Sequence, residues 1–338
     1  MKYMKKLVLV GLVLLASVMV LAGCKNDSVP EVKEPPYLTF KADSEQTLTM
    51  RTVNTYTLHE SLQYSVGGGE WKQLQAETAI SFGGTAGDLR MRGKSVGGMG
   101  IYNNLEAQFA IIGFGNSEVK VACTGDIRTL VDYESYSTAD TSRACFYCLF
   151  KDCTSLTSAP DLPAETLSER CYSRMFMNCI SLTSAPDLPA TTLAEACYSY
   201  MFTDCTSLAE APALPATTLA EHCYDGMFAD CTSLAEVPAL PATILAEACY
   251  SYMFYDCRSL VRVPDLPAET LVKRCYLGMF YGCTKLTGVT MLATDISAER
   301  ALEDWLYGVA PAGTIFTAAD TILPEESIPA GWIAVPQQ

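Results

Sequence analysis

Histidine and basic residues are scarce in this chain, and each shortage argues against a class of function. The 338 residues include 2 histidines and 3 tryptophans. His59 and His222 stand outside any recognisable nucleophile or metal motif, so we expect no enzymatic activity, no metal and no other cofactor. Surface carboxylates are plentiful enough for a glycosidase pair, but nothing in the sequence motivates one.

Lys and Arg number 23 against 38 Asp and Glu, a formal net charge of −15. Because such a field repels phosphate backbones, we expect no nucleic-acid partner.

The one long apolar run lies at the N-terminus. Three lysines precede apolar residues 7–21, and the tetrapeptide Leu-Ala-Gly-Cys then ends at Cys24. This pattern predicts a secretory signal peptide over residues 1–23. The tetrapeptide resembles a bacterial lipobox, which implies that Cys24 is lipidated and anchors the chain to a membrane. The expected location is the cell envelope, on the exposed side of the outer membrane. An ordinary signal peptide followed by an unrelated cysteine is the alternative.

The next hundred residues predict a tether and a β-domain. Residues 24–36 hold three prolines and no apolar periodicity, which indicates an extended lipidated tether. Residues 37–130 alternate apolar and polar side chains in short runs between glycine-rich turns, which predicts an immunoglobulin-like β-sandwich. The glycines of residues 83–87 lack the lysine and helix of a phosphate-binding loop, so we interpret them as a turn.

The rest of the chain is dominated by a 26-residue repeat. Its first cysteines are Cys171, Cys197, Cys223, Cys249 and Cys275. A fixed period of this length is typical of a solenoid, whose units bury their apolar faces against their neighbours. Apolar residues recur at every fourth position over 193–205, and Thr192 with Glu195 matches a capping box, so each unit is predicted to begin with a short helix.

A very short parallel strand is expected after each helix, shortened by a recurring proline. These strands are expected around Leu156, Leu182, Leu208, Leu234 and Leu260. The expected fold class is therefore α+β: a β-sandwich, then a leucine-rich-repeat-like α/β solenoid of about six units over residues 131–296, then a C-terminal cap over 297–338. Within the cap, residues 298–309 predict a final helix in which Leu302, Trp305 and Leu306 cover the open core.

Fifteen cysteines in an exported chain suggest disulfides. The eight-residue spacing of Cys197 and Cys205 along a helix is about 12 Å, too long for a disulfide, so we interpret both as small buried hydrophobes, with disulfides as the alternative. Cys145 and Cys148 form a CxxC pair, but only Cys145 belongs to the repeat, which argues against zinc or redox chemistry. A disulfide between Cys123 and Cys148 remains a hypothesis.

The repeated Met-Phe-x-x-Cys-Thr-Ser-Leu core and the Leu-Pro-Ala-Thr-Thr-Leu segments resemble the BspA-like leucine-rich repeats of bacterial surface proteins, especially lipoproteins of Bacteroidetes. The resemblance covers about residues 145–296. It implies an extracellular, membrane-anchored scaffold, since adhesion to host proteins or other cells is attributed to some members. No binding residue is transferred by it, and the alanine-proline step here departs from longer aliphatic repeats.

Periodicity locates a candidate binding surface beside the inward leucines. The residues at this register differ between units, and they are Ser158, Ser184, Glu210, Glu236 and Arg262. Ordinary solvated variation is the alternative. A second stripe follows each first cysteine: Tyr172, Tyr198, Tyr224, Tyr250 and Tyr276. We expect these tyrosines to pack between units rather than to anchor a ligand.

The function predicted from these patterns is a surface-anchored, non-enzymatic adhesion or protein-interaction scaffold, whose partner is a host or bacterial surface protein. The alternative is a glycan-binding lipoprotein for nutrient capture, with the β-sandwich as sugar-binding module and Trp71 or Tyr102 as aromatic platforms.

Overall fold

The alternating residues of the N-terminal region form two sheets. The computed structural model describes residues 34–102, 106–139, 141 and 146–337, so the signal peptide, Cys24 and the tether up to residue 33 lie outside the described residues, as does Cys145. The strands before residue 125 are β1 (Leu38–Lys41), β2 (Gln46–Val53), β3 (Gln63–Val66), β4 (Lys72–Gln73), β5 (Ile80–Phe82), β6 (Leu89–Arg92), β7 (Gly100–Tyr102), β8 (Ala107–Phe114) and β9 (Val121–Thr124).

The two sheets face each other across an apolar core. One has the order β10-β9-β1-β6-β3-β4 and the other β5-β2-β8-β7. Because side chains alternate along each strand, one face of each sheet is buried. Phe40 of β1 meets Phe114 of β8 across the core, with ring centroids 5.8 Å apart. The same Phe40 ring lies 6.3 Å from Phe150 of the first repeat, so the core continues into the repeats.

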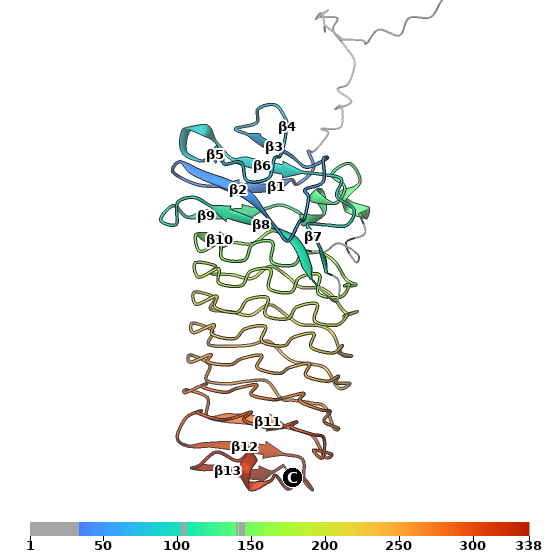
Figure 1. The fold of residues 1–338 in the computed structure, drawn as a ribbon. Helices are drawn as coiled ribbons and strands as arrows, with labels where there is room; N and C mark the ends of the chain where they lie inside the picture. The colour runs from blue at the N-terminus through green and yellow to red at the C-terminus, as the bar shows by residue number, and fades with distance from the viewer. Residues whose placement is uncertain (1–33, 103–105, 140, 142–145, 338) are drawn as a thin grey trace, which may run out of the picture. The chain divides into compact units, whose positions relative to one another are not determined.

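Backbone pairing also joins the sheets to the repeats. Strand β10 (Leu156–Ser158) belongs to the first repeat and pairs in parallel with β9. The amide of Val121 donates to the carbonyl of Ser155 at 2.9 Å, and that of Ile112 to Leu149 at 2.8 Å. The first repeat is thereby hydrogen-bonded to both sheets, and the later repeats stack below it (Figure 1).

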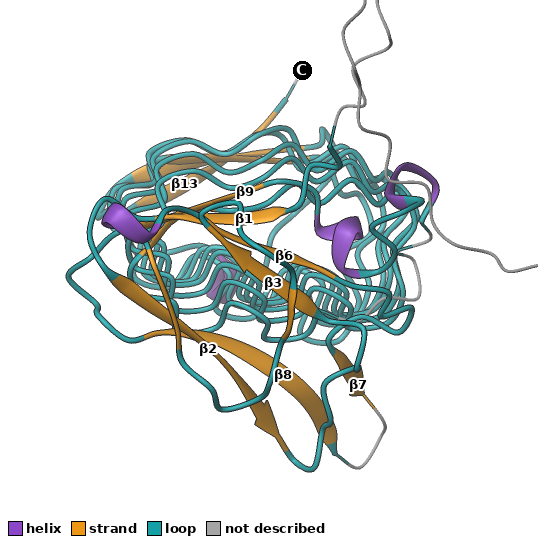
Figure 2. Ribbon diagram, turned by 90° about the horizontal axis from the view of Figure 1, so that it is seen from above, coloured by secondary structure: helices purple, strands orange, loops and turns teal. Residues whose placement is uncertain are grey.

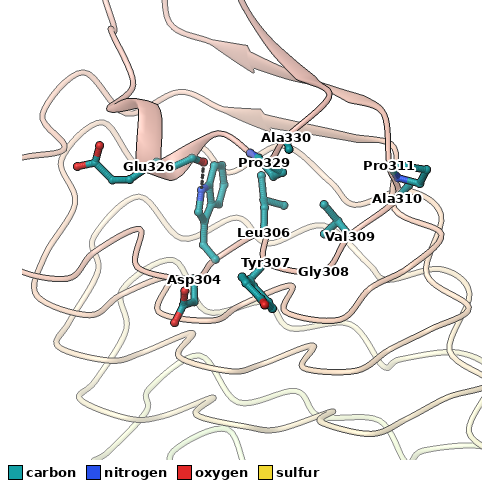
Figure 3. A pocket seen from close by; sticks show the side chains of 12 residues that line it. Asp304, Leu306, Tyr307, Gly308, Val309, Ala310, Pro311, Glu326, Pro329 and Ala330 are labelled. Carbon is teal, nitrogen blue, oxygen red and sulfur yellow. Dashed lines mark hydrogen bonds between the residues drawn. The ribbon is translucent and has the colours of Figure 1, made fainter.

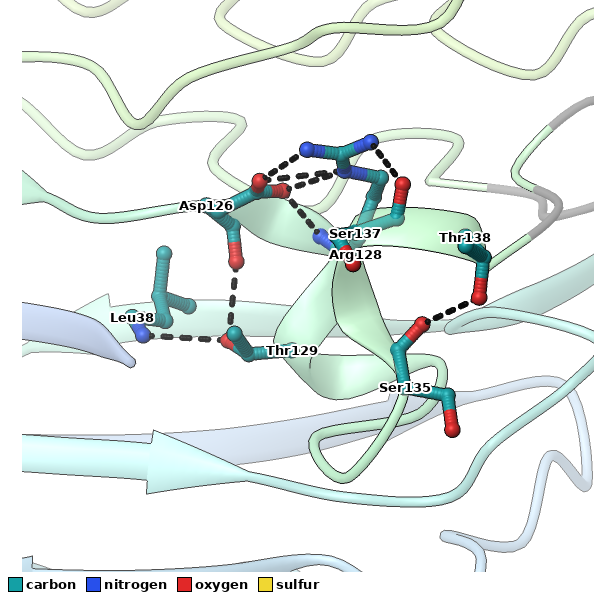
Figure 4. A network of polar contacts seen from close by, with 7 residues as sticks. All are labelled: Leu38, Asp126, Arg128, Thr129, Ser135, Ser137 and Thr138. Carbon is teal, nitrogen blue, oxygen red and sulfur yellow. Dashed lines mark hydrogen bonds and ion pairs between the residues drawn. The ribbon is translucent and has the colours of Figure 1, made fainter. Parts of the chain in front are cut away.

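A polar network fixes the chain where it leaves β9. The Arg128 guanidinium donates to the Asp126 carboxylate at 2.6–3.0 Å and to the Ser137 carbonyl at 3.2 Å. The Thr129 hydroxyl donates to the Asp126 carbonyl at 2.8 Å and accepts from the Leu38 amide at 3.3 Å (Figure 4). Asp126 also forms a parallel bridge with Asp161 of the next coil.

The repeats contain no α-helix among the described residues, so the predicted α+β class with an α/β solenoid is wrong. The helices that the structure describes are short 3-10 turns: η1 (Gly84–Ala86), η2 (Ile127–Leu130), η3 (Tyr136–Thr138) and η4 (Glu325–Ser327). Strands are gathered in three sheets, none of which runs through the repeats. Each repeat is instead a coil of turns, and the coils superpose when seen from above (Figure 2).

The segment predicted as a helix is a chain of turns, which we call the turn ribbon. It comprises residues 170–179 and their equivalents at 26-residue intervals. The amides of Ser173 and Met175 bond to carbonyls three residues back, whereas the amide of Arg174 between them bonds to the Ser199 carbonyl of the next coil at 2.9 Å. The torsion φ is positive at every fourth residue, including Arg170 and Arg174. A helix keeps φ near −63° throughout, so these residues exclude it.

The strict four-residue spacing explains the error. A helical turn takes 3.6 residues, so positions four apart drift around a helix, whereas they stay in line along the turn ribbon. Cys171, Met175 and Cys179 all point into the core, and so do their neighbours Tyr172 and Phe176. A stripe of two buried residues that recurs every four residues fits a chain of turns better than a helix.

The remainder of each coil, which we call the extended face, comprises residues 156–168 and their equivalents. Of the strands predicted here, only the one at Leu156 forms, as β10. The other coils meet through isolated bridges such as Glu210 with Glu236 and Thr218 with Ile244. Each coil carries prolines on this face, which lack the N–H that a ladder needs.

Aromatic ladders run through the interior of the stack. The tyrosine stripe is buried, which confirms its predicted packing, and successive rings from Tyr172 to Tyr276 stack at 5.7–6.1 Å. The phenylalanines from Phe150 to Phe280 stack beside them at 5.3–5.7 Å. Each coil therefore completes the apolar surface of its neighbours.

A small parallel sheet and a tryptophan close the C-terminal end. The sheet consists of β11 (Gly288–Met291), β12 (Gly313–Thr317) and β13 (Trp332–Pro336). The helix predicted over 298–309 is wrong, because this segment forms turns. Leu302, Trp305 and Leu306 are nevertheless buried as expected. The Trp305 indole donates to the Ser327 carbonyl at 2.8 Å, which ties the last coil to the segment that covers it.

Candidate interaction surfaces

The five residues predicted to face a ligand lie on the extended face. Ser184, Glu210, Glu236 and Arg262 are exposed. Ser158 differs, because its hydroxyl donates to the Cys123 carbonyl at 2.9 Å and accepts from the Cys123 amide at 3.1 Å. Ser158 therefore secures the first coil to β9. The other four are available to solvent, and whether they bind a ligand stays a prediction.

Two of these residues line a groove on the extended face. Its volume is about 540 Å³, and its lining comprises residues 235–237 and 261–264. Glu236 and Arg262 supply charge, whereas Val261, 43% exposed, supplies apolar surface. Apolar surface rimmed by charge is the usual composition of a protein-binding patch. We call this groove the valine groove.

A second hollow, which we call the polar pocket, opens on the turn ribbon. Its volume is about 270 Å³. It is lined by Tyr147, Arg170, Ser173, Arg174, Ala196, Ser199, Tyr200, His222 and Asp225. At the position of Ala196 the coils on either side carry the larger Arg170 and His222, so the Cys197 coil leaves space between them.

Two positively charged side chains form one wall of the polar pocket. Arg174 donates to the Tyr147 hydroxyl at 3.1 Å, and its guanidinium lies 5.4 Å from the centre of the Tyr200 ring. Arg170 is paired with Glu195 at 2.9 Å and with Glu169 at 3.3 Å. The Arg174 guanidinium is thus held in place by aromatic side chains, without an ion pair to a carboxylate among the described residues.

The opposite wall carries a carboxylate. Asp225 Oδ2 lies 3.4 Å from His222 Nδ1, and Oδ1 is buried with no hydrogen-bond partner among the described residues. Burial raises the pKa of Asp225 to about 6, and the nearby His222 and Arg174 oppose this shift. Burial also raises the pKa of Tyr200, whose ring stands beside this carboxylate. Burial of a carboxylate oxygen without a partner is costly.

A third cavity lies at the C-terminal end. Its volume is about 280 Å³, and residues 304–311, 326–327 and 329–330 line it. The side chains of Leu306 and Val309 point toward the segment that carries Pro329 (Figure 3). Its walls are mainly apolar, and it lies between the last coil and the segment that covers it.

The cysteines belong to the core. All those of the described residues are buried, which confirms their interpretation as small hydrophobes, and the hypothesised disulfide is wrong because Cys123 and Cys148 are both thiols. Repeat thiols donate to carbonyls of an earlier coil, as Cys205 does to Phe176 at 3.1 Å. Burial raises the pKa of Cys197 and Cys205 to about 12, so these thiols stay protonated and unreactive near neutral pH.

Comparison with known families accounts for the repeats. The model of the BspA-type leucine-rich repeat region matches residues 134–261 and 214–299, with six copies. The chain carries BspA-type leucine-rich repeats. No curated protein and no solved structure matches the chain significantly. Within its described part, no helix has the length and hydropathy needed to cross a membrane.

The polar pocket escaped prediction from the sequence, although the repeat alignment holds a signal for it. At the position of Asp225 the other coils carry Tyr147, Ser173, Ser199, Ser251, Leu277 and Glu303. Asp225 is the one acid in this column from Tyr147 to Leu277, which marks a local role. His222 and Asp225 are three residues apart and are neighbours on a helix as well as on the turn ribbon, so that pair was predictable, whereas its meeting with Arg174 of another coil was not.

Proposed function

We propose that this protein is a non-enzymatic adhesion or protein-interaction scaffold, held by a lipid on Cys24 at the exposed surface of the bacterial outer membrane. Repeats of the BspA type suggest a surface protein-interaction or adhesion scaffold. The observation that carries the proposal is the valine groove, where Val261 is exposed between Glu236 and Arg262. A host or bacterial surface protein is the expected partner, and nucleic acid is disfavoured by the net charge of −15.

The chemistry of the groove supports a protein partner. Exposed apolar side chains gain free energy when a partner covers them, and flanking charges select which partner does so. The prolines that keep this face from forming a continuous ladder leave its side chains free to vary between coils. A scaffold constant in its core and variable on one face suits binding rather than catalysis.

Binding is tested by comparing two variants on a panel of host extracellular-matrix proteins and on intact bacterial cells. Val261→Asp places a charge in the valine groove, whereas Ile322→Asp changes a residue that is exposed but outside it. We expect at least one ligand whose binding falls at least about tenfold with Val261→Asp and is unchanged with Ile322→Asp. Equal binding by both variants to every ligand would place the interaction elsewhere.

The anchor requires a separate test. The sequence around Cys24 supports lipidation, and we expect labelled palmitate to enter the wild-type protein but not Cys24→Ser. Protease added to intact cells should digest the wild-type protein if it faces outward. Label in the Cys24→Ser variant, or full protection from protease, would contradict the anchor or the orientation respectively.

The alternative of a sugar-binding sandwich is less well supported. The Trp71 ring, its expected platform, already contacts the Tyr37 ring at 4.9 Å and the Arg92 guanidinium at 4.1 Å. An aromatic platform needs a free face for a sugar ring. A glycan array probed with the purified protein distinguishes the two, because the scaffold proposal expects no glycan signal that depends on Trp71.

A further inference from the structure

The polar pocket presents opposite charges on two walls of one small cavity. Arg170 and Arg174 belong to the Cys171 coil, and His222 with Asp225 to the Cys223 coil. The Cys197 coil between them supplies the floor. The tyrosine rings of these three coils are spaced at 5.9 and 5.8 Å, so the walls stand two coil spacings apart. A ligand that bridges them must carry a negative group toward the arginines and a positive group toward Asp225.

A buried carboxylate at Asp225 lowers the stability of the fold. Only 15% of its side chain is exposed, and Oδ1 has no hydrogen-bond partner among the described residues. Serine occupies the same position in three other coils, leucine and tyrosine in two more, and Glu303 in the last, so the coil geometry does not require a carboxylate. A largely buried carboxylate at a position that does not require an acid, with His222 at 3.4 Å beside it, is typical of a binding site, where a cationic group of the ligand adds a further partner.

The surroundings of Asp225 have a matched counterpart two coils later. A Cβ on Gly226 would lie 2.4 Å from the Tyr200 ring, and one on Gly278 would lie 2.4 Å from the Tyr252 ring. In both places the tyrosine ring therefore packs directly against the glycine of the next coil. The counterpart carries Leu277 in place of Asp225. The shared tyrosine-glycine contact is thus structural, and the carboxylate is the addition.

Catalysis by this cluster is less well supported than binding. His222 and Asp225 have the relation of the base and orienting acid of a hydrolytic triad. In the described residues, however, the Ser173 hydroxyl donates to the Ser199 carbonyl at 3.1 Å rather than to His222. No hydroxyl nucleophile is in contact with the imidazole there.

We propose that the polar pocket binds a small zwitterion of the α-amino acid type, whose ammonium pairs with the Asp225 carboxylate and whose carboxylate pairs with Arg174. The planar guanidinium of Arg174, held by Tyr147 and Tyr200, matches a carboxylate with two parallel donors. An ammonium beside Asp225 favours the ionised form of its carboxylate. The cavity of about 270 Å³ is small enough to select a single amino acid. This role goes beyond the scaffold function and does not depend on it.

Isothermal titration of the purified protein with three probes tests the proposal. The probes are l-alanine, which carries both charges, and propionate and ethylamine, which each carry one. We expect l-alanine to bind at least about tenfold more tightly than either single-charge probe, because each of those probes makes only one of the two charged contacts. Binding of propionate as tight as that of l-alanine would show an anion site instead and overturn the proposal.

Matched variants assign the two contacts. Asp225→Asn and Arg174→Gln should each weaken l-alanine binding at least about tenfold. Asp230→Asn, in the same coil but outside the pocket, and Arg258→Gln, an exposed arginine elsewhere on the stack, should bind as the wild type does. Circular dichroism of each variant checks its folding. Absence of l-alanine binding to the folded wild type, or equal binding by Asp225→Asn, would sink the proposal whether or not the valine groove binds protein.

Discussion

The two sides of each coil use the backbone in opposite ways. On the turn ribbon, amides bond alternately within the coil and to the next coil, as Met175 does to Tyr172 and Phe176 to Met201. On the extended face, prolines and isolated bridges leave the coils less tightly paired. The ribbon also carries the buried cysteines and aromatic rings. The difference shows that the ribbon holds the stack together, which leaves the extended face free to vary.

The largest expected effect is unfolding of the ribbon in alkali. Burial raises the pKa of Cys197 and Cys205 from 9.0 to about 12. Because the folded state holds these protons more tightly, their stabilisation is complete below pH 9 and is lost as the pH rises toward 12. A shift of three units corresponds to about 4 kcal/mol per thiol. We expect cooperative unfolding in this range, followed by circular dichroism together with thiolate absorbance; thiolate formation without unfolding would contradict the buried ladder.

Loss of one ladder ring should come next. Phe228 is buried and stacks on Phe202 at 5.6 Å and on Phe254 at 5.7 Å. Phe228→Ala should lower the free energy of unfolding by about 3–5 kcal/mol. Val261→Ala, on the extended face, should cost less than about 1 kcal/mol because its side chain is largely hydrated already. Urea unfolding measures both, and similar losses would remove the distinction between the two sides.

The turn ribbon carries a largely buried carboxylate at Asp225. Its pKa is raised from 3.8 to about 6, so its protonated form stabilises the fold below pH 3.8 and this contribution disappears as the pH rises through 6. Asp225→Asn should therefore stabilise the protein at pH 8 by about 2–3 kcal/mol, and by little at pH 3.5. Urea unfolding at both pH values tests this, with Asp230→Asn as the control. A variant less stable than the wild type at pH 8 would mean that the His222 contact outweighs burial.

Replacement of Gly226, whose backbone is tightly packed, should have a smaller effect on the free energy of unfolding. Gly226 has φ of 59°, and a Cβ there would lie 2.4 Å from the Tyr200 ring. Gly226→Ala should cost about 1–2 kcal/mol for the left-handed torsion, and more for the displaced ring. Gly97→Ala is the control, because no atom lies within 4 Å of a Cβ at that position. A double-mutant cycle with Tyr200→Ala separates the two costs, and additivity in that cycle would show that the ring does not contribute.

Sequence patterns could predict burial in this molecule but not backbone geometry. The period located the buried Cys, Tyr, Met and Phe columns, and even Trp305 at the end of the core. A column of apolar residues four apart satisfies both a helix and a chain of turns, and the hydrogen bonds that decide between them join residues 25 apart, such as Tyr172 and Cys197. The polar pocket depends on the same coil-to-coil contacts, so Arg174 and Asp225 could not be brought together from local spacing.

The smallest effect on stability is expected on the extended face, where the largest effect on binding is proposed. Glu236 and Arg262 are exposed, so charge reversal of either should change the free energy of unfolding by less than about 0.5 kcal/mol. Because charge pattern selects partners, Arg262→Glu should still slow association with any protein that binds the valine groove, most clearly at low salt. Surface plasmon resonance at two salt concentrations measures this, with Arg258→Glu as a control outside the groove. If both reversals slow association equally, the net charge of the protein determines encounter and the groove has no specific role in it.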